Sequence, residues 1–195
     1  MNKIAIIGTG YVGLVTGTGM AEFGNKVICT DIDKIKIENI NSGKIPIYEP
    51  GLEDIIKRNI KNNRLSFSSN IKESILQSDV IVIAVGTPES EGGQADMSFV
   101  FSVVETISKN LNDYKIIVTK STVPIGSGRR IIDLINEKIN NPNVYDYVSN
   151  PEFLREGSAL KDFLWPDRVI IGTNSDKAYR IMRNVYRPLY INKNI

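Results

Sequence analysis

The feature that most constrains this chain is the run Ile6–Gly13, IIGTGYVG, which places three glycines between a strand-like and a helix-like segment. Residues 3–8 are rich in β-branched side chains and end in glycine. Residues 11–23 read as a helix that stops at Gly24. A second strand-like run, KVICTD, follows directly. The N-terminus is therefore predicted to be a strand, a tight glycine turn, a helix and another strand.

The same alternation continues to the end of the chain. Short apolar runs without a polar face are typical of strands buried on both sides. Helical patterns lie between them, including an N-x-x-E capping arrangement from Asn70 to Glu73 and apolar spacing over 131–139. We expect an α/β fold of the Rossmann type, a doubly wound and mostly parallel sheet with helices on both faces. The later strands are predicted at 65–68, 79–85, 115–121, 145–150 and 168–173, a last helix at 175–189, and irregular segments at 41–52 and 86–98.

Composition limits the possible chemistry. The 195 residues are 42% hydrophobic and 24% charged, typical of one globular domain, and we assign residues 1–195 to a single domain. A net charge of +2 does not indicate nucleic-acid binding, and no secretory or membrane-spanning pattern is present, so we expect a cytoplasmic protein without a membrane partner. The chain has no histidine and one cysteine, Cys29, and we predict no metal site.

The glycine turn predicts a dinucleotide site. Backbone N–H groups between Gly10 and Gly13, at the positive end of a helix, can receive a pyrophosphate. Gly10 allows close approach of the ligand, and Gly13 allows the helix to pack against the strand. Asp31 ends the second strand, eighteen residues after Gly13. Dinucleotide-binding units place the acid that binds the ribose at about this spacing, roughly 20 residues after the glycine motif. This acid favours NAD over NADP, although the nearby Lys34 and Lys36 weaken that preference. FAD is a minor alternative.

Four stretches carry a resemblance to a known family. They are GYVGLVTG, PIYEPGLE, KSTVPIGSG at 120–128 and SNPEFLREGSALKDFLWPDRVIIG at 149–172. Together they resemble the UDP-glucose/GDP-mannose dehydrogenase family of nucleotide-sugar dehydrogenases, and within it the UDP-glucose 6-dehydrogenases. The likeness covers the whole chain, and NPEFLREG is its most specific part.

The resemblance implies an NAD-dependent double oxidation of UDP-glucose to UDP-glucuronate, through an aldehyde and an enzyme-bound thioester. It implies catalytic roles for Thr122 and Glu152, which would hold or activate water. A carboxylate such as Glu152 can act as a base where partial burial raises its pKa. The resemblance also implies a sugar-binding loop of Glu152, Phe153, Leu154, Arg155 and Glu156, and NAD contacts from Gly8, Gly10, Tyr11, Val12, Gly13, Asp31, Lys36, Thr87, Thr122 and Glu156.

Part of the machinery of that family is missing from this sequence. The resemblance places the catalytic thiol, and a substrate-binding lysine and asparagine, in a C-terminal substrate-binding half that this chain lacks. Cys29 lies two residues before Asp31, near the expected adenosine end, so we interpret it as a buried strand residue. We expect the chain to bind NAD without forming uronic acid, and the full-length enzyme to be a homodimer.

Three alternatives are open from sequence. The chain can be a non-catalytic NAD-binding module, which would ignore nucleotide sugars. It can belong to a dehydrogenase of another nucleotide sugar, such as GDP-mannose. It can also belong to a hydroxyacid dehydrogenase that shares the glycine motif, but KSTVPIG and EFLRE are evidence against that reading.

Overall fold

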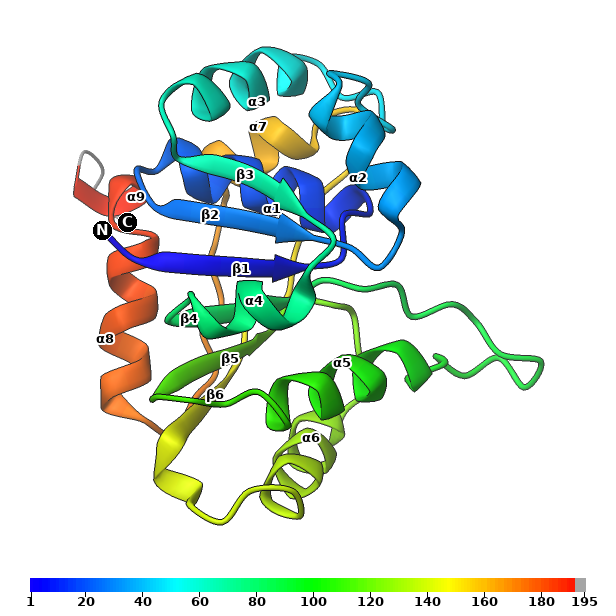
Figure 1. Cartoon of the computed structure of the whole chain (residues 1–195), viewed down its shortest axis with the longest axis vertical. Coiled ribbons are helices and arrows are strands. Elements are labelled where there is room, and N and C mark those ends of the chain that lie inside the picture. The colour runs from blue at the N-terminus through cyan, green and yellow to red at the C-terminus, as the bar shows by residue number, and fades with distance from the viewer. Residues whose placement is uncertain (192–195) are drawn as a thin grey trace.

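The computed structural model describes residues 1–191 and contains a six-stranded parallel sheet within them (Figure 1). The strand order is β3-β2-β1-β4-β5-β6, so the chain moves outward from β1 in one direction and then returns to add β4 on its other side. This order is that of doubly wound dinucleotide-binding folds, with a switch point between β1 and β4. The strands are β1 (Lys3–Ile7), β2 (Lys26–Thr30), β3 (Leu65–Ser68), β4 (Val80–Ile83), β5 (Lys115–Thr119) and β6 (Tyr145–Ser149).

Helices cover both faces of the sheet, as predicted. Buried residues of the first group of helices form one apolar cluster with the sheet, and those of the second group form another on the opposite face. The first group is α1 (Tyr11–Glu22), α2 (Lys34–Asn41), α3 (Leu52–Lys61), α7 (Ala159–Leu164) and α8 (Asp176–Val185). The second is α4 (Ile71–Leu76), α5 (Ser98–Ser108) and α6 (Ser127–Asn136); a 3₁₀ turn (Pro142–Val144) and α9 (Pro188–Ile191) complete the described chain.

Successive strand residues contribute to opposite clusters, because side chains alternate across a strand. Ile6 of β1 packs in the cluster with α1, and Ile7 packs in the cluster with α5. Both side chains are buried. Two-sided burial is the reason that these strands read as continuous apolar runs.

Helix α1 lies unusually close to its neighbours because glycines line it. A Cβ at Gly17 would lie 2.2 Å from Cys29 Sγ, and one at Gly19 would lie 2.2 Å from the Phe163 ring of α7. Phe163 in turn stacks on Phe23 with ring centroids 5.5 Å apart. Glycine lowers helix propensity, so close packing is what keeps these residues in a helix.

Most predicted elements are confirmed, including the irregular segments and the cap at Asn70, whose side chain accepts a hydrogen bond from the Glu73 N–H at 3.1 Å. The predicted strand at 168–173 is wrong. Gly172 pairs with Ser149 as an isolated antiparallel bridge, and the residues before it are irregular. The Ile170 carbonyl accepts its hydrogen bond from the Asn150 side chain, not from a strand ladder.

The predicted helix at 175–189 is broken. It ends at Val185, and the short α9 begins at Pro188. Tyr186, between them, is buried and packs against the Phe163 ring with centroids 6.2 Å apart. The residues between α8 and α9 therefore pack against α7.

Candidate functional site

The glycine turn lies at the switch point, directly after β1. Gly8 has a φ of +103°, and its N–H donates to the Thr30 carbonyl at 2.8 Å. A Cβ at Gly13 would lie 1.9 Å from the Gly8 carbonyl oxygen, so only glycine permits the helix to start this close to the strand. At Gly10, no atom of the described chain outside this glycine and its two neighbours lies within 4 Å of the position of a Cβ. The turn is therefore closed against the protein at Gly13 and open to a ligand at Gly10.

Asp31 lies beside this turn, directly after β2. Its Oδ2 accepts hydrogen bonds from the Thr9 N–H at 2.9 Å and the Thr9 hydroxyl at 2.8 Å, and forms an ion pair with Lys36 Nζ at 3.1 Å. Its Oδ1 accepts from the Asp33 N–H at 3.1 Å. Burial raises the pKa of Asp31, but these hydrogen bonds outweigh burial and hold the pKa below its ordinary value. The carboxylate is fixed in its charged form at the mouth of the turn.

A cavity of about 290 Å³ joins the turn to the acid. Gly8, Gly10, Asp31 and Lys36 form its polar side. The rest of its lining is mostly apolar, apart from Ser102 and Thr106, which suits a flat aromatic base. Sequence analysis missed this apolar wall, because its residues come from four separate segments; it includes Ile32, Ile71, Val85, Phe99 and Val103.

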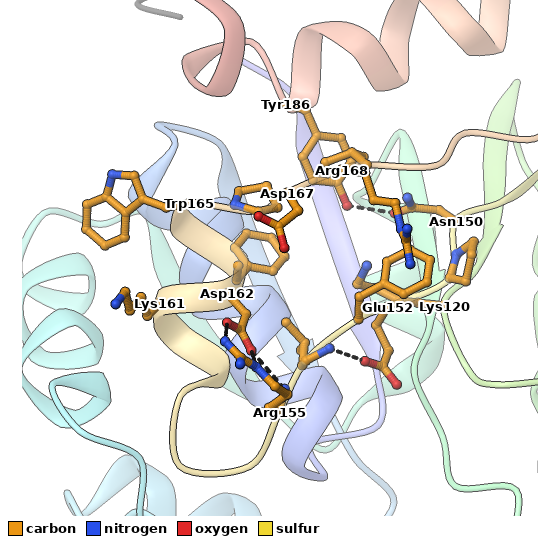
Figure 2. A pocket seen from close by; sticks show the side chains of 16 residues that line it. Lys120, Asn150, Glu152, Arg155, Lys161, Asp162, Trp165, Asp167, Arg168 and Tyr186 are labelled. Atoms are coloured by element: carbon orange, nitrogen blue, oxygen red, sulfur yellow. Dashed lines mark hydrogen bonds and ion pairs between the residues drawn. The ribbon is translucent and has the colours of Figure 1, made fainter. Parts of the chain in front are cut away.

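A second cavity, of about 450 Å³, lies beyond the carboxyl ends of β5 and β6 (Figure 2). Lys120 directly follows β5, and Asn150 directly follows β6. The Asn150 side chain accepts from the Tyr186 hydroxyl at 2.6 Å and donates to the Ile170 carbonyl at 2.7 Å. These bonds join Asn150 to Tyr186, which lies between α8 and α9, and to Ile170. Residues 152–155 of the predicted sugar-binding loop form another part of the wall, and Glu156, the last residue of that loop, does not line the cavity.

The loop residues point in different directions. Glu152 is partly buried, and its Oε2 accepts the Leu154 N–H at 2.6 Å (Figure 2). Arg155 forms a two-pronged pair with Asp162 of α7, with N–O distances of 3.0 and 2.7 Å. The Phe153 ring lies 4.5 Å from the Arg168 guanidinium carbon. The loop thus has a defined shape in which Glu152 lines the cavity.

Thr87 and Thr122, predicted from different segments, lie together. The Thr87 hydroxyl donates to the Thr122 carbonyl at 2.8 Å. Thr87 follows β4 and Thr122 follows β5, so both lie at the edge of the sheet that carries the two cavities. Val12 lies in the first turn of α1, and Glu156 is exposed in the loop.

Lys120 is a buried cation that the sequence analysis did not single out. Its side chain lines the second cavity, with Nζ 5.9 Å from the centroid of the Phe163 ring. Burial lowers the pKa of Lys120 to about 8, and the nearby Glu152 carboxylate offsets part of that effect. A local signal was missing, because a lysine after a strand is ordinarily solvated.

Cys29 is confirmed as a buried strand residue, and burial raises the pKa of its thiol to about 12. Its Sγ packs against Gly17, and Cys29 is not among the residues that line the second cavity. Among residues 1–191, no three His, Cys, Asp or Glu side chains are grouped in a way that could hold a metal ion. No helix in this part of the chain is long and apolar enough to cross a membrane.

The strand order, the glycine turn at the switch point, the charged Asp31 and the adjoining cavity define a dinucleotide-binding domain. Residues 2–190 match the NAD binding domain of the UDP-glucose/GDP-mannose dehydrogenase family. The chain belongs to this family, and its cofactor is NAD.

Relatives agree with this assignment. The chain is 50% identical to UDP-glucose 6-dehydrogenase TuaD of Bacillus subtilis over 97% of its own length and 41% of that protein. It is 47% identical to UDP-glucose 6-dehydrogenase of Rhizobium meliloti, over 98% of this chain and 44% of the relative. The chain therefore spans less than half the length of these relatives.

Solved structures agree as well. A UDP-glucose dehydrogenase from Pyrobaculum islandicum matches with a TM-score of 0.92 and 35% identity, over 97% of this chain and 44% of that one. A GDP-mannose dehydrogenase from Pseudomonas aeruginosa matches with a TM-score of 0.92 and 34% identity, over 96% of this chain and 44% of that one. A 3-hydroxyisobutyrate dehydrogenase from Mycobacterium tuberculosis, at a TM-score of 0.62 and 15% identity, shares the fold alone.

Proposed function

We propose that this chain is the NAD-binding half of a UDP-glucose 6-dehydrogenase, an enzyme that oxidises UDP-glucose to UDP-glucuronate. The observation that carries the proposal is the presence of two cavities at the carboxyl edge of one sheet, one at the glycine turn and one at the 152–156 loop. Ligands of open α/β folds bind at this edge. The names of the relatives given above favour UDP-glucose as the sugar.

The first cavity has the groups that NAD requires. The pyrophosphate would lie at the open Gly10 position and the N-terminus of α1, the ribose at Asp31, and the adenine against the apolar wall. Bound NAD supplies the hydride acceptor for oxidation of an alcohol. Thr87 and Thr122 would position the nicotinamide end, because they lie together at the next strand ends.

The second cavity would receive the sugar. Glu152 would hold or activate water in proton transfer, assisted by Thr122, and the neighbouring Lys120 would keep the charge of its carboxylate compensated. The loop residues Phe153 to Glu156 would contact the substrate. The full-length enzyme would supply the catalytic thiol from its other half, and we propose that it acts as a homodimer.

We propose that the chain alone binds NAD and forms no uronic acid, since Cys29 is buried and does not line the second cavity. The purified chain, supplied with NAD and UDP-glucose, is expected to give no steady increase in NADH absorbance. Sustained NADH formation would contradict this part of the proposal.

Thermal melting with each ligand tests the choice of substrate, because a ligand selective for the folded state raises the melting temperature. NAD is expected to raise it, and UDP-glucose is expected to raise it more than GDP-mannose does. A larger shift with GDP-mannose would assign the domain to that substrate. A shift with NAD and none with either sugar would favour a binding module without a substrate.

A further inference from the structure

Glu49 is a buried carboxylate that the proposed reaction does not use. It lies in the irregular segment between α2 and α3, and only 6% of its surface is exposed. A buried carboxylate is stable only where donors compensate its charge. The donors to Glu49 come from two segments that lie far from it in the sequence.

Both oxygens of Glu49 bind the segment that follows the sugar-binding loop. Oε2 accepts from the Gly157 N–H at 3.0 Å, and Oε1 accepts from the Leu160 N–H at 3.2 Å. Gly157 directly follows the loop and has a φ of +83°, and Leu160 lies in the first turn of α7. The carboxylate therefore spans the end of the loop and the start of the next helix.

Oε2 also accepts a short hydrogen bond from the Tyr11 hydroxyl, and that hydroxyl accepts from the Gly157 N–H at 2.8 Å. Burial raises the pKa of Tyr11, and the Glu49 contact raises it further, so the phenol keeps the proton that it donates. Tyr11 begins α1 and follows Gly10, the open position of the glycine turn. One carboxylate thus joins the start of α1, the end of the loop and the start of α7.

We propose that Glu49 is a positioning residue that fixes the 152–157 loop to the first turn of α1 and transmits occupation of the dinucleotide site to that loop. The inference rests on the proposed function, because the loop matters only if it receives the sugar beside the bound dinucleotide. Its physical basis is the geometry alone: without Glu49, the Gly157 and Leu160 N–H groups and the Tyr11 hydroxyl lose their shared acceptor.

Hydrogen exchange at single amides, measured by NMR on this chain, tests the proposal. Glu49→Gln replaces one acceptor oxygen by a donor, and exchange at Gly157 and Leu160 should become at least about tenfold faster through local opening. Glu53→Gln makes the same chemical change on the exposed first turn of α3 and should leave both amides unchanged. Unchanged exchange at both amides in Glu49→Gln would overturn the proposal.

Tyr11→Phe is a second variant, which leaves the carboxylate in place should Glu49→Gln fail to fold. It removes one of the two acceptors of the Gly157 N–H and none of Leu160. Exchange should therefore accelerate at Gly157 while Leu160 stays within about twofold. Equal acceleration at both amides would indicate a general loosening and would contradict a specific role for the Glu49 contact.

Saturating NAD separates positioning from simple stabilisation. In the unaltered chain, NAD should slow exchange at Gly157, and in Glu49→Gln it should still bind but no longer slow that amide. Slowing of equal size in both proteins would overturn the transmission step. Failure of the proposed function would show differently, as absence of NAD binding in the unaltered chain while the variants still alter exchange without ligand.

Discussion

The two cavities lie on one edge of the sheet but are built in different ways. The dinucleotide cavity depends on backbone shape: a turn that glycines keep tight on one side and open on the other. The second cavity depends on buried polar groups: Lys120 and Asn150 line it, and Glu49 binds N–H groups of the segment that follows the 152–156 loop. The first should therefore respond to added volume, and the second to changes in charge and hydrogen bonding.

The largest effect is expected from Gly13→Ala. The added Cβ would meet the Gly8 carbonyl oxygen at 1.9 Å, and both groups belong to backbone that cannot move aside. The free energy of unfolding should fall by about 3 kcal/mol in urea titrations, although alanine is the better helix former. Gly10→Ala is the matched control, and it should keep the stability but weaken NAD binding at least tenfold. Equal stability loss in the two variants would contradict the contrast between the two glycines.

Lys120 should make stability depend on pH. Its folded pKa is about 8 against an ordinary 10.5, so between these values the unfolded chain binds more protons and stability rises with pH. The change should be on the order of 3 kcal/mol between pH 7.5 and 10.5. The free energy of unfolding of Lys120→Met, measured by urea titration at each pH, should not show this rise.

The difference between the unaltered chain and Lys120→Met isolates the effect of Lys120 from tyrosines that titrate in the same range. Lys109, which caps the C-terminal end of α5, has a side chain that is 66% exposed, so Lys109→Met serves as a control and should keep the rise. The same pH slope in the unaltered chain and in Lys120→Met would show that Lys120 is solvated.

Much of the dinucleotide cavity could be predicted from sequence, because its signals are local. The strand, the turn, the helix and Asp31 occupy one continuous stretch, and each constrains the next. The apolar wall could not be predicted, since residues such as Ile71 and Phe99 meet only after the sheet has formed. A pattern of apolar residues does not show which of them will face a cavity.

The second cavity was less predictable. Residues 168–173 have strand composition, yet Val169 and Ile170 are 37% and 44% exposed and the Asn150 side chain takes the Ile170 carbonyl. Propensity reports local preference, and here distant partners override it. Glu49 lies in the PIYEPGLE stretch, but its contacts could not be predicted, because its carboxylate oxygens accept from N–H groups more than a hundred residues away.

Asp31→Ala should have a moderate effect. Loss of the fixed carboxylate should weaken NAD about tenfold and narrow the preference for NAD over NADP, because repulsion of a 2′-phosphate is lost as well. Calorimetric titration with both dinucleotides measures this. Asp33→Ala removes the cap of α2, whose side chain accepts from the Lys36 N–H at 3.0 Å. It should cost about 1 kcal/mol of stability without altering the preference; an altered preference there would mean that Asp31 is not the selective group.

The smallest effect is expected from Arg155→Gln. The side chain is 77% exposed, so its ion pair with Asp162 is screened by water. The Arg155 N–H also donates to Asp162 at 3.0 Å, and that backbone link survives the substitution. The melting temperature should stay close to that of the unaltered chain. A large decrease would show that charge pairing, rather than the backbone, holds the loop.

The glycine turn and Asp31 should hold NAD in this chain by themselves. Calorimetric titration of the purified chain, first with NAD and then with NADP, tests it most directly. We predict one NAD per chain and clearly weaker binding of NADP. Absence of binding for both dinucleotides, in a chain that circular dichroism shows to be folded, would contradict it.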